Sequence, residues 1–245
     1  MINIKILYKK ITQSKTNLFI GLSICCLLIV SFLDLFDNNF SFHDILVESH
    51  GLVFDLFIFG ILLTTYETLS SRQEKIDRYK EEISDYKFWK SEESMYRTRG
   101  LIKRLVELNE KELDLSFCYL STDKSLSQYK DMRNWKFTGA TLDESFYMLC
   151  DMSNCNFYMA KLQESSFDQV NLTNCNFGAT NLLGTEFSSC DLTNCKFENA
   201  AVLEHNWLDK LESQKNIGVD ILREKYTLSA KTFNNGGTYY NVVQL

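Results

Sequence analysis

Cysteine is the residue type whose spacing in this sequence first suggests chemistry. Three of the eight cysteines, Cys155, Cys175 and Cys195, stand twenty residues apart. Thiols stacked in this way are candidate metal ligands or redox groups. Zinc, however, takes four ligands in a tetrahedron, and no histidine lies in the segment that carries these thiols. Buried thiols otherwise behave as small apolar side chains, so we expect these cysteines to pack, without a metal, a cofactor or disulfides.

Two acidic residues form the second candidate site. Asp55 lies about eight residues into an apolar segment, and Glu48, seven residues earlier, shares its helix face. An acid inside a membrane must be neutralised, hydrated or paired. In an oligomer this face would line a water-filled path that favours cations. Alternatively, Glu48 and His50 lie among lipid headgroups, and Asp55 is protonated or bonded to a neighbouring helix.

Other chemistry finds little support in the sequence. We find no nucleophile paired with a base, no glycine loop for phosphates and only three histidines, so we expect no catalytic residues and no enzyme. The formal net charge of -6 argues against a nucleic-acid-binding surface, which needs clustered lysine and arginine.

Apolar residues are concentrated near the N-terminus and predict a membrane hairpin. Residues 17–36 are about twenty residues long and carry no charge before Asp34, enough to cross roughly 30 Å of hydrocarbon. Residues 47–66 form a second, less apolar span after a short external loop over 37–46. Basic residues precede the first span, in a cytoplasmic segment over 1–16, and follow the second, which places both termini in the cytoplasm.

A helical stalk and solenoid cap is predicted over 67–112. Its first part shows two heptads with an apolar seam, which predicts either self-association or a helix packed on its own chain. The seam residues are Ile76, Tyr79, Ile83 and Tyr86. A second amphipathic turn is predicted to plug the first coil of the solenoid with Leu101, Ile102, Leu105, Val106 and Leu108.

The dominant pattern is a five-residue period from Lys130 to Glu204, in which a large apolar residue recurs fifteen times and a small residue usually stands two places before it. Neither a strand nor a helix has this period, whereas a square coil with one unit on each side satisfies it. The similar segments that begin at Asp151, Asn171 and Asp191 give four sides per coil. The predicted solenoid core includes Phe137, Phe157, Phe177 and Phe197 in one column and Leu142, Leu162 and Leu182 in the next.

These residues resemble the pentapeptide-repeat family, whose pattern is a small residue, then Asp or Asn, then Leu or Phe. GATNL at Gly178 and SSCDL at Ser188 show that order. The resemblance implies a right-handed quadrilateral β-helix, which we place over 113–204. The large side chains of Lys130 and Trp135 at small positions predict an irregular first coil, with an earlier partial coil around Cys118.

The expected fold is therefore a two-helix transmembrane hairpin plus an α-helical stalk, followed by this pentapeptide-repeat solenoid and a C-terminal cap helix and tail over 205–245. The helical spacing of Leu203, Trp207, Leu208 and Leu211 predicts a lid over the last coil. A turn at Asn235–Gly237 precedes a β-prone tail that would serve as a further strand or as an edge for association.

The architecture also resembles the two-helix membrane effectors of bacterial anti-phage systems such as retrons. That resemblance implies a protein of the bacterial inner membrane whose hairpin permeabilises the membrane in an abortive-infection response. The alternative is a non-conducting, membrane-anchored scaffold for protein interaction. Both hypotheses predict contact with membrane lipid and either a cytoplasmic protein partner or self-association, and neither involves nucleic acid.

Overall fold

The structure is a computed structural model that describes residues 21, 24–26, 28–29, 32, 40–121 and 124–245. The chain divides into two compact units, Met1–Lys75 and Ile76–Leu245. Most of the first predicted span, residues 17–36, lies outside the described residues, as does the N-terminal segment over 1–16.

The long helix α3 runs from Phe40 to Asp85. The predicted external loop over 37–46 is therefore wrong from Phe40 onward, since no glycine or proline interrupts the helix there. Among the described residues, one stretch, His50–Asp85, is long and apolar enough to cross a membrane by length and composition, and 17% of its most apolar window is buried within the protein.

Helix α4, Glu92–Glu107, follows a short turn after α3. The Ser91 side chain accepts a hydrogen bond from the Ser94 backbone N–H at 3.1 Å and so caps the helix. Ile76 and Ile83 of α3 share one hydrophobic core with Leu101, Ile102 and Leu105 of α4. In the structure the seam packs on the same chain, and the residues of the predicted plug join the hydrophobic core of the coil.

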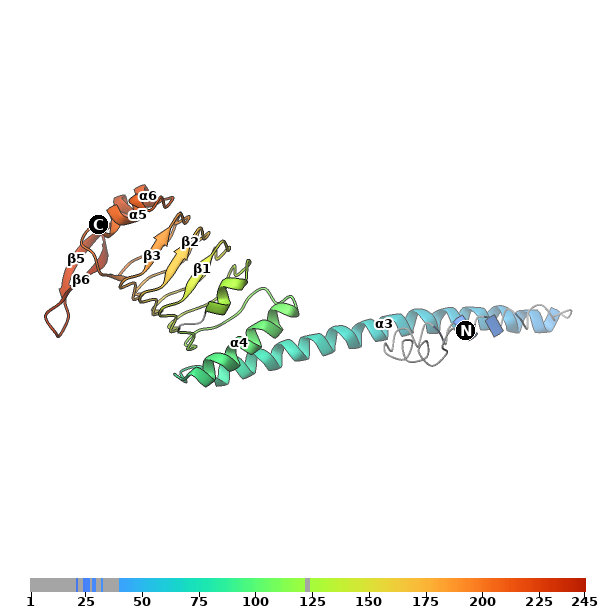
Figure 1. Cartoon of the computed structure of the whole chain (residues 1–245). Helices are drawn as coiled ribbons and strands as arrows, with labels where there is room; N and C mark the ends of the chain where they lie inside the picture. The colour runs from blue at the N-terminus through green and yellow to red at the C-terminus, as the bar shows by residue number, and fades with distance from the viewer. Residues whose placement is uncertain (1–20, 22–23, 27, 30–31, 33–39, 122–123) are drawn as a thin grey trace, which may run out of the picture. The chain divides into compact units, whose positions relative to one another are not determined.

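The centre of the second unit is a parallel coil that repeats every twenty residues (Figure 1). Strands β1 (Phe146–Met148), β2 (Ser166–Asp168) and β3 (Glu186–Ser188) form a parallel sheet on one wall. Isolated bridges with the same twenty-residue register, such as Asp151 to Asn171, hold the other walls. The coil that contains Trp135 keeps this register, so the predicted irregularity is wrong there. The predicted partial coil around Cys118 is confirmed, since Asp114 pairs with Lys136 and Tyr119 with Thr141, each 22 residues on. The 3-10 helix η1 (Lys124–Gln128) is inserted after this partial coil.

The core of the coil consists of stacked side chains, as the five-residue period predicts. The rings of Phe137 and Phe157 are 4.9 Å apart and tilted by 4°, and those of Phe177 and Phe197 are 5.1 Å apart and tilted by 3°. This spacing is close to the distance between neighbouring strands. Leucines fill the next wall, where Leu142, Leu162 and Leu182 are at most 1% exposed.

The corners of the coil place one residue in every five at positive φ, two places after the large residue. Asparagine adopts this conformation readily, and Asn154, Asn174 and Asn194 have φ of 61°, 60° and 59°. On much of the coil a preceding Asp or Asn stabilises the turn by accepting a hydrogen bond from the backbone N–H two residues on, as Asp151 does from Ser153 at 2.9 Å. On the β1–β3 wall, where Phe146, Ser166 and Glu186 hold the equivalent positions, the backbone is extended instead.

The C-terminal end of the coil is capped by α5 (Trp207–Ser213), α6 (Val219–Lys225) and a hairpin of β5 (Tyr226–Thr232) and β6 (Thr238–Gln244). The Trp207 ring meets Phe197 edge-on at 5.2 Å, which confirms a lid. Leu203 is 47% exposed and does not belong to that lid, because it still lies at the end of the coil, after β4 (Ala201–Val202). The predicted tail strand exists, but β6 pairs with both β4 and β5 and is not a free edge.

Candidate functional site

The three stacked cysteines are structural. Cys155, Cys175 and Cys195 each donate through the thiol to a backbone carbonyl 23 residues earlier, at 3.0 Å. Thr180 and Thr185 make the equivalent bond through their hydroxyls, at 2.8 and 2.7 Å. The small positions therefore favour residues that fill little space and also donate a hydrogen bond across one coil.

Burial favours the protonated thiol at five of the buried cysteines. Desolvation raises the pKa of Cys118, Cys150 and Cys195 to about 12 and that of Cys190 to about 11, and it also raises the pKa of Cys175. A neutral thiol is a poor nucleophile and a poor metal ligand. Within the described part of the chain, no group of three or more His, Cys, Asp or Glu side chains is arranged to hold a metal ion.

A ladder of asparagine side chains runs along one corner of the coil. The Asn174 amide donates to Asn154 at 3.2 Å, and the Asn194 amide donates to Asn174 at 3.3 Å. This arrangement is the one that the twenty-residue spacing predicts. Asn194 stands at the C-terminal end of the ladder and lines a cavity beside the last coils.

Both members of the predicted acidic site lie in α3, and Asp55 lies on the surface of that helix, not in a closed site. Asp55 is exposed, whereas Val53, Gly60 and Thr64 form a buried stripe. Asp55 is about 200° around the helix axis from Val53, so it points away from that stripe. Its neighbours on the exposed face include Leu52 and Phe59, which are 63% and 62% exposed.

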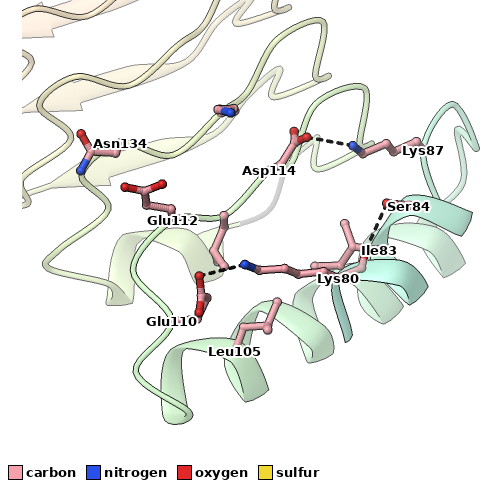
Figure 2. A pocket seen from close by; sticks show the side chains of 11 residues that line it. Lys80, Ile83, Ser84, Lys87, Leu105, Glu110, Glu112, Asp114 and Asn134 are labelled. Carbon is pink, nitrogen blue, oxygen red and sulfur yellow. Dashed lines mark hydrogen bonds and ion pairs between the residues drawn. The ribbon is translucent and has the colours of Figure 1, made fainter. Parts of the chain in front are cut away.

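A first cavity, of about 360 Å³, lies where the end of α3 meets the start of the coil (Figure 2). Two ion pairs cross it: Lys80 Nζ lies 2.9 Å from Glu110 Oε1, and Lys87 Nζ lies 3.2 Å from Asp114 Oδ2. Burial by itself would raise the pKa of Asp114, but hydrogen bonds from Ser116 and Lys87 outweigh it and lower that pKa. Lys80 and Lys87 are thus paired within the chain, and the two ion pairs hold the end of α3 against the coil. We call this cavity the clasp cavity.

A second cavity, of about 740 Å³, lies beside the last three coils and is bordered by the C-terminal cap. Most of its lining residues are polar by type, and its surface is about equally polar and apolar. The residues are Tyr158, Asn176, Gly178, Asn194, Cys195, Lys196, Glu198, Asn199, Lys225, Tyr226 and Gln244. We call this set the cap groove.

The cap groove was not predicted from the sequence. Its residues come from three successive coils and from α6, β5 and β6. Both β5 and α6 were missed because each is only seven residues long and is held by packing on the coil. Gly178 carried the one available signal. A Cβ there would lie 3.1 Å from the Tyr158 ring, so glycine allows that ring to lie against the wall.

Comparisons with known proteins bear on the repeat. The family model described as "Pentapeptide repeats (8 copies)" matches residues 171–201. Among solved structures, HetL of Nostoc sp. strain PCC 7120, a pentapeptide-repeat protein involved in heterocyst differentiation regulation, is 17% identical with a TM-score of 0.20; the alignment covers 36% of this chain and 39% of HetL. A pentapeptide-repeat protein of the Arabidopsis thaliana thylakoid lumen is 19% identical with a TM-score of 0.18, over 43% of this chain and 79% of that one. A search of curated proteins finds no match.

The family match falls on the same residues in which the structure shows the regular coil. Residues 171–201 contain the Phe177 and Phe187 stacks and the Asn194 end of the ladder. They also contain the turns in which Asn171, Asn176, Asn181 and Asp191 accept a hydrogen bond from the backbone N–H two residues on. Pentapeptide-repeat proteins are in general non-enzymatic scaffolds. The five-residue register, the twenty-residue coil and the family match together identify the solenoid of this chain as a pentapeptide-repeat β-helix.

Proposed function

We propose that this chain is a membrane-anchored interaction scaffold, with the outer walls of its β-helix presented to a partner protein at the cytoplasmic face of the bacterial inner membrane. The observation that carries the proposal is the filled interior of the coil. Phe157, Phe167 and Phe177 are fully buried in contact with one another, so the core offers no space for a ligand. Recognition must then take place on the walls and at the ends.

Membrane anchoring is supported by the composition of α3. Its apolar part exposes large side chains that water would not favour, among them Leu52, Phe54 and Leu62, each 58% to 63% exposed. The surrounding sequence supports the orientation, because Lys and Arg flank the two apolar stretches and are absent between them. In this arrangement lipid covers α3, and the coil faces the cytoplasm.

Site-specific photocrosslinking in living cells tests the scaffold. A photoreactive residue is placed at one outward position on each wall, at Arg133, Tyr158, Gln163 or Ser188, in the full-length chain. We expect one wall to give a discrete crosslinked product containing a second protein, while the other walls serve as matched controls. Crosslinks from no wall, to lipid only, or from all four walls equally would contradict a scaffold with a defined binding face.

A permeabilising effector is a second candidate, and the position of Asp55 favours it. An acid on the exposed face of an apolar helix costs about 2.5–3.5 kcal/mol at the centre of a membrane unless it is paired or hydrated. Association of several copies through this face would hydrate Asp55, with Glu48 one heptad away, and would create a path for cations. Assembly of the helices would then be the conducting event.

Membrane-potential measurements distinguish the two candidates. If the chain conducts, induced expression should depolarise cells, Asp55→Leu should abolish the effect, and Glu81→Leu, which removes an acid outside the apolar segment, should leave it unchanged. Equal depolarisation by both variants would contradict a role for Asp55. Polarised cells at matched expression of the wild type would favour the non-conducting scaffold.

A further inference from the structure

The cap groove and the clasp cavity differ in whether their lysine side chains are paired within the chain. In the clasp cavity, Lys80 and Lys87 are paired within the chain at 2.9 and 3.2 Å. In the cap groove, Lys196 and Lys225 make no side-chain ion pair or hydrogen bond within the described residues. Two lysines thus line a cavity of about 740 Å³ without a side-chain partner in the part of the chain that the structure describes.

The rest of the groove can recognise a polypeptide. The side chains of Asn199 and Gln244 make no hydrogen bond in the described structure, and amides both donate to and accept from a peptide backbone. Tyr158 is 43% exposed and lies against Gly178, so its ring presents a flat apolar surface. A tyrosine surrounded by polar groups is typical of protein interfaces, whereas small-molecule pockets are lined mainly by apolar side chains.

The walls of the groove are fixed. Tyr226 is 9% exposed, and its hydroxyl accepts a hydrogen bond from the Phe197 backbone N–H at 3.4 Å. The Val242 N–H donates to the Ala200 carbonyl at 2.9 Å, which ties β6 to the last coil beside the groove. A groove built on paired strands and a packed coil is pre-organised, so a ligand loses less free energy in ordering the site.

We propose that the cap groove is a docking site for an acidic, extended segment of a partner protein. Lys196 and Lys225 bind its carboxylates, the free amides pair with its backbone, and Tyr158 packs against a side chain between them. Glu198 lies in the same groove and disfavours a uniformly anionic ligand such as a nucleic-acid backbone. The inference rests on the proposed scaffold function, because it assigns the binding face of that scaffold.

Fluorescence anisotropy with the full-length protein in detergent tests the site. The probes are labelled hexapeptides with aspartate or glutamate at two positions, matched hexapeptides with asparagine or glutamine there, and a six-nucleotide oligothymidine. We expect saturable binding of acidic peptides that weakens as salt is raised, and binding of the amide peptides at least tenfold weaker. The double variant Lys196→Gln/Lys225→Gln should lose about tenfold in affinity.

The matched control is Lys161→Gln/Lys231→Gln, which removes the same charge from surfaces outside the groove. Its affinity should equal that of the wild type, and both double variants should keep the unfolding midpoint of the wild type. Equal losses in the two double variants, or oligothymidine bound more tightly than every acidic peptide, would overturn the assignment. Failure of all peptides together with in-cell crosslinks from a wall other than that of Tyr158 would overturn the groove and leave the scaffold intact, whereas absence of crosslinks from every wall would overturn the scaffold.

Discussion

At the scale of single residues, the small position of each repeat has two roles. The side chain must be small enough for the corner, and where it carries a hydroxyl or thiol it also donates to the carbonyl of the large residue one coil earlier. Thr180 shows both roles, since it is 1% exposed and donates to the Phe157 carbonyl at 2.8 Å. This explains why Ser, Thr and Cys outnumber Ala at these positions.

Thr180→Val separates the two roles, because valine has nearly the same shape and no hydroxyl. We expect it to lower the free energy of unfolding by about 0.5–1.5 kcal/mol, measured by urea denaturation, since a buried hydrogen bond is lost. Thr138→Val, which removes a hydroxyl from a partly exposed position of the coil, should change stability by less than about 0.5 kcal/mol. Equal stability of the wild type and Thr180→Val would show that shape alone selects this residue.

Much of the structure at this scale could be predicted from the sequence, because every repeat shows the same residue pattern. The columns of Phe157 and Leu162, the burial of Cys175 and the ladder at Asn174 all follow from one period. The thiol-to-carbonyl bonds were missed, although the excess of hydroxyl and thiol groups at the small position was a visible signal.

At the scale of elements, the end of the coil depends on one asparagine. Asn216 Oδ1 accepts from the Cys190 N–H at 2.8 Å, and its Nδ2 donates to the carbonyls of Phe187 and Leu211, each at 2.8 Å. These bonds satisfy the last coil and the end of α5 together. A solenoid needs such a cap because its final coil has no following coil to pair with.

Asn216→Ala should therefore loosen the cap. We expect a loss of about 1–3 kcal/mol in the free energy of unfolding, because buried backbone groups lose their partners, and faster trypsin cleavage after Lys210. Lys215→Gln, at the neighbouring exposed residue, is the control and should match the wild type in both measurements. Unchanged proteolysis in Asn216→Ala would mean that Trp207 packing suffices to hold the cap.

The clasp between α3 and the coil should respond to acid. Because the pKa of Asp114 is lowered in the folded protein, its contribution to stability is present above the unfolded pKa of about 3.9 and is lost as the pH falls through the folded value. The difference in melting temperature between the wild type and Asp114→Asn should thus be constant above about pH 5 and shrink below about pH 4. Glu112→Gln, in the same cavity, should show a smaller difference, and a pH-independent difference for Asp114→Asn would contradict the clasp.

The elements that could not be predicted from the sequence are those held in place by tertiary contacts. Leu203 and Trp207 have helical spacing, yet Leu203 ends the coil while α5 begins at Trp207. Strand β5 has no strong period of its own and is held by pairing along β6. Since Lys225, Tyr226 and Gln244 of the late elements complete the cap groove, no pattern in the repeat alone predicts it.

At the scale of the whole molecule, the chain combines an apolar helix with a β-helix whose interior is filled by side chains. Composition predicted both kinds of structure, and the twenty-residue coil is confirmed. The membrane hairpin, its orientation and the partner remain proposals, because they depend on lipid and on other proteins. The central claim is that α3 anchors the coil at the cytoplasmic face of the membrane, where its walls are open to a partner.

Cysteine accessibility in spheroplasts tests that claim most directly. The variant Gln163→Cys places a thiol on an exposed position of the coil, in a background with Cys25→Ser and Cys26→Ser, where the remaining thiols are buried and their reactivity is low. We predict that the protein stays in the membrane pellet after carbonate washing. We also predict that a membrane-impermeant maleimide labels the thiol introduced by Gln163→Cys only after the spheroplasts are permeabilised. The same background without the Gln163→Cys change should remain unlabelled. Labelling of intact spheroplasts, or recovery of the protein in the soluble fraction, would contradict the account.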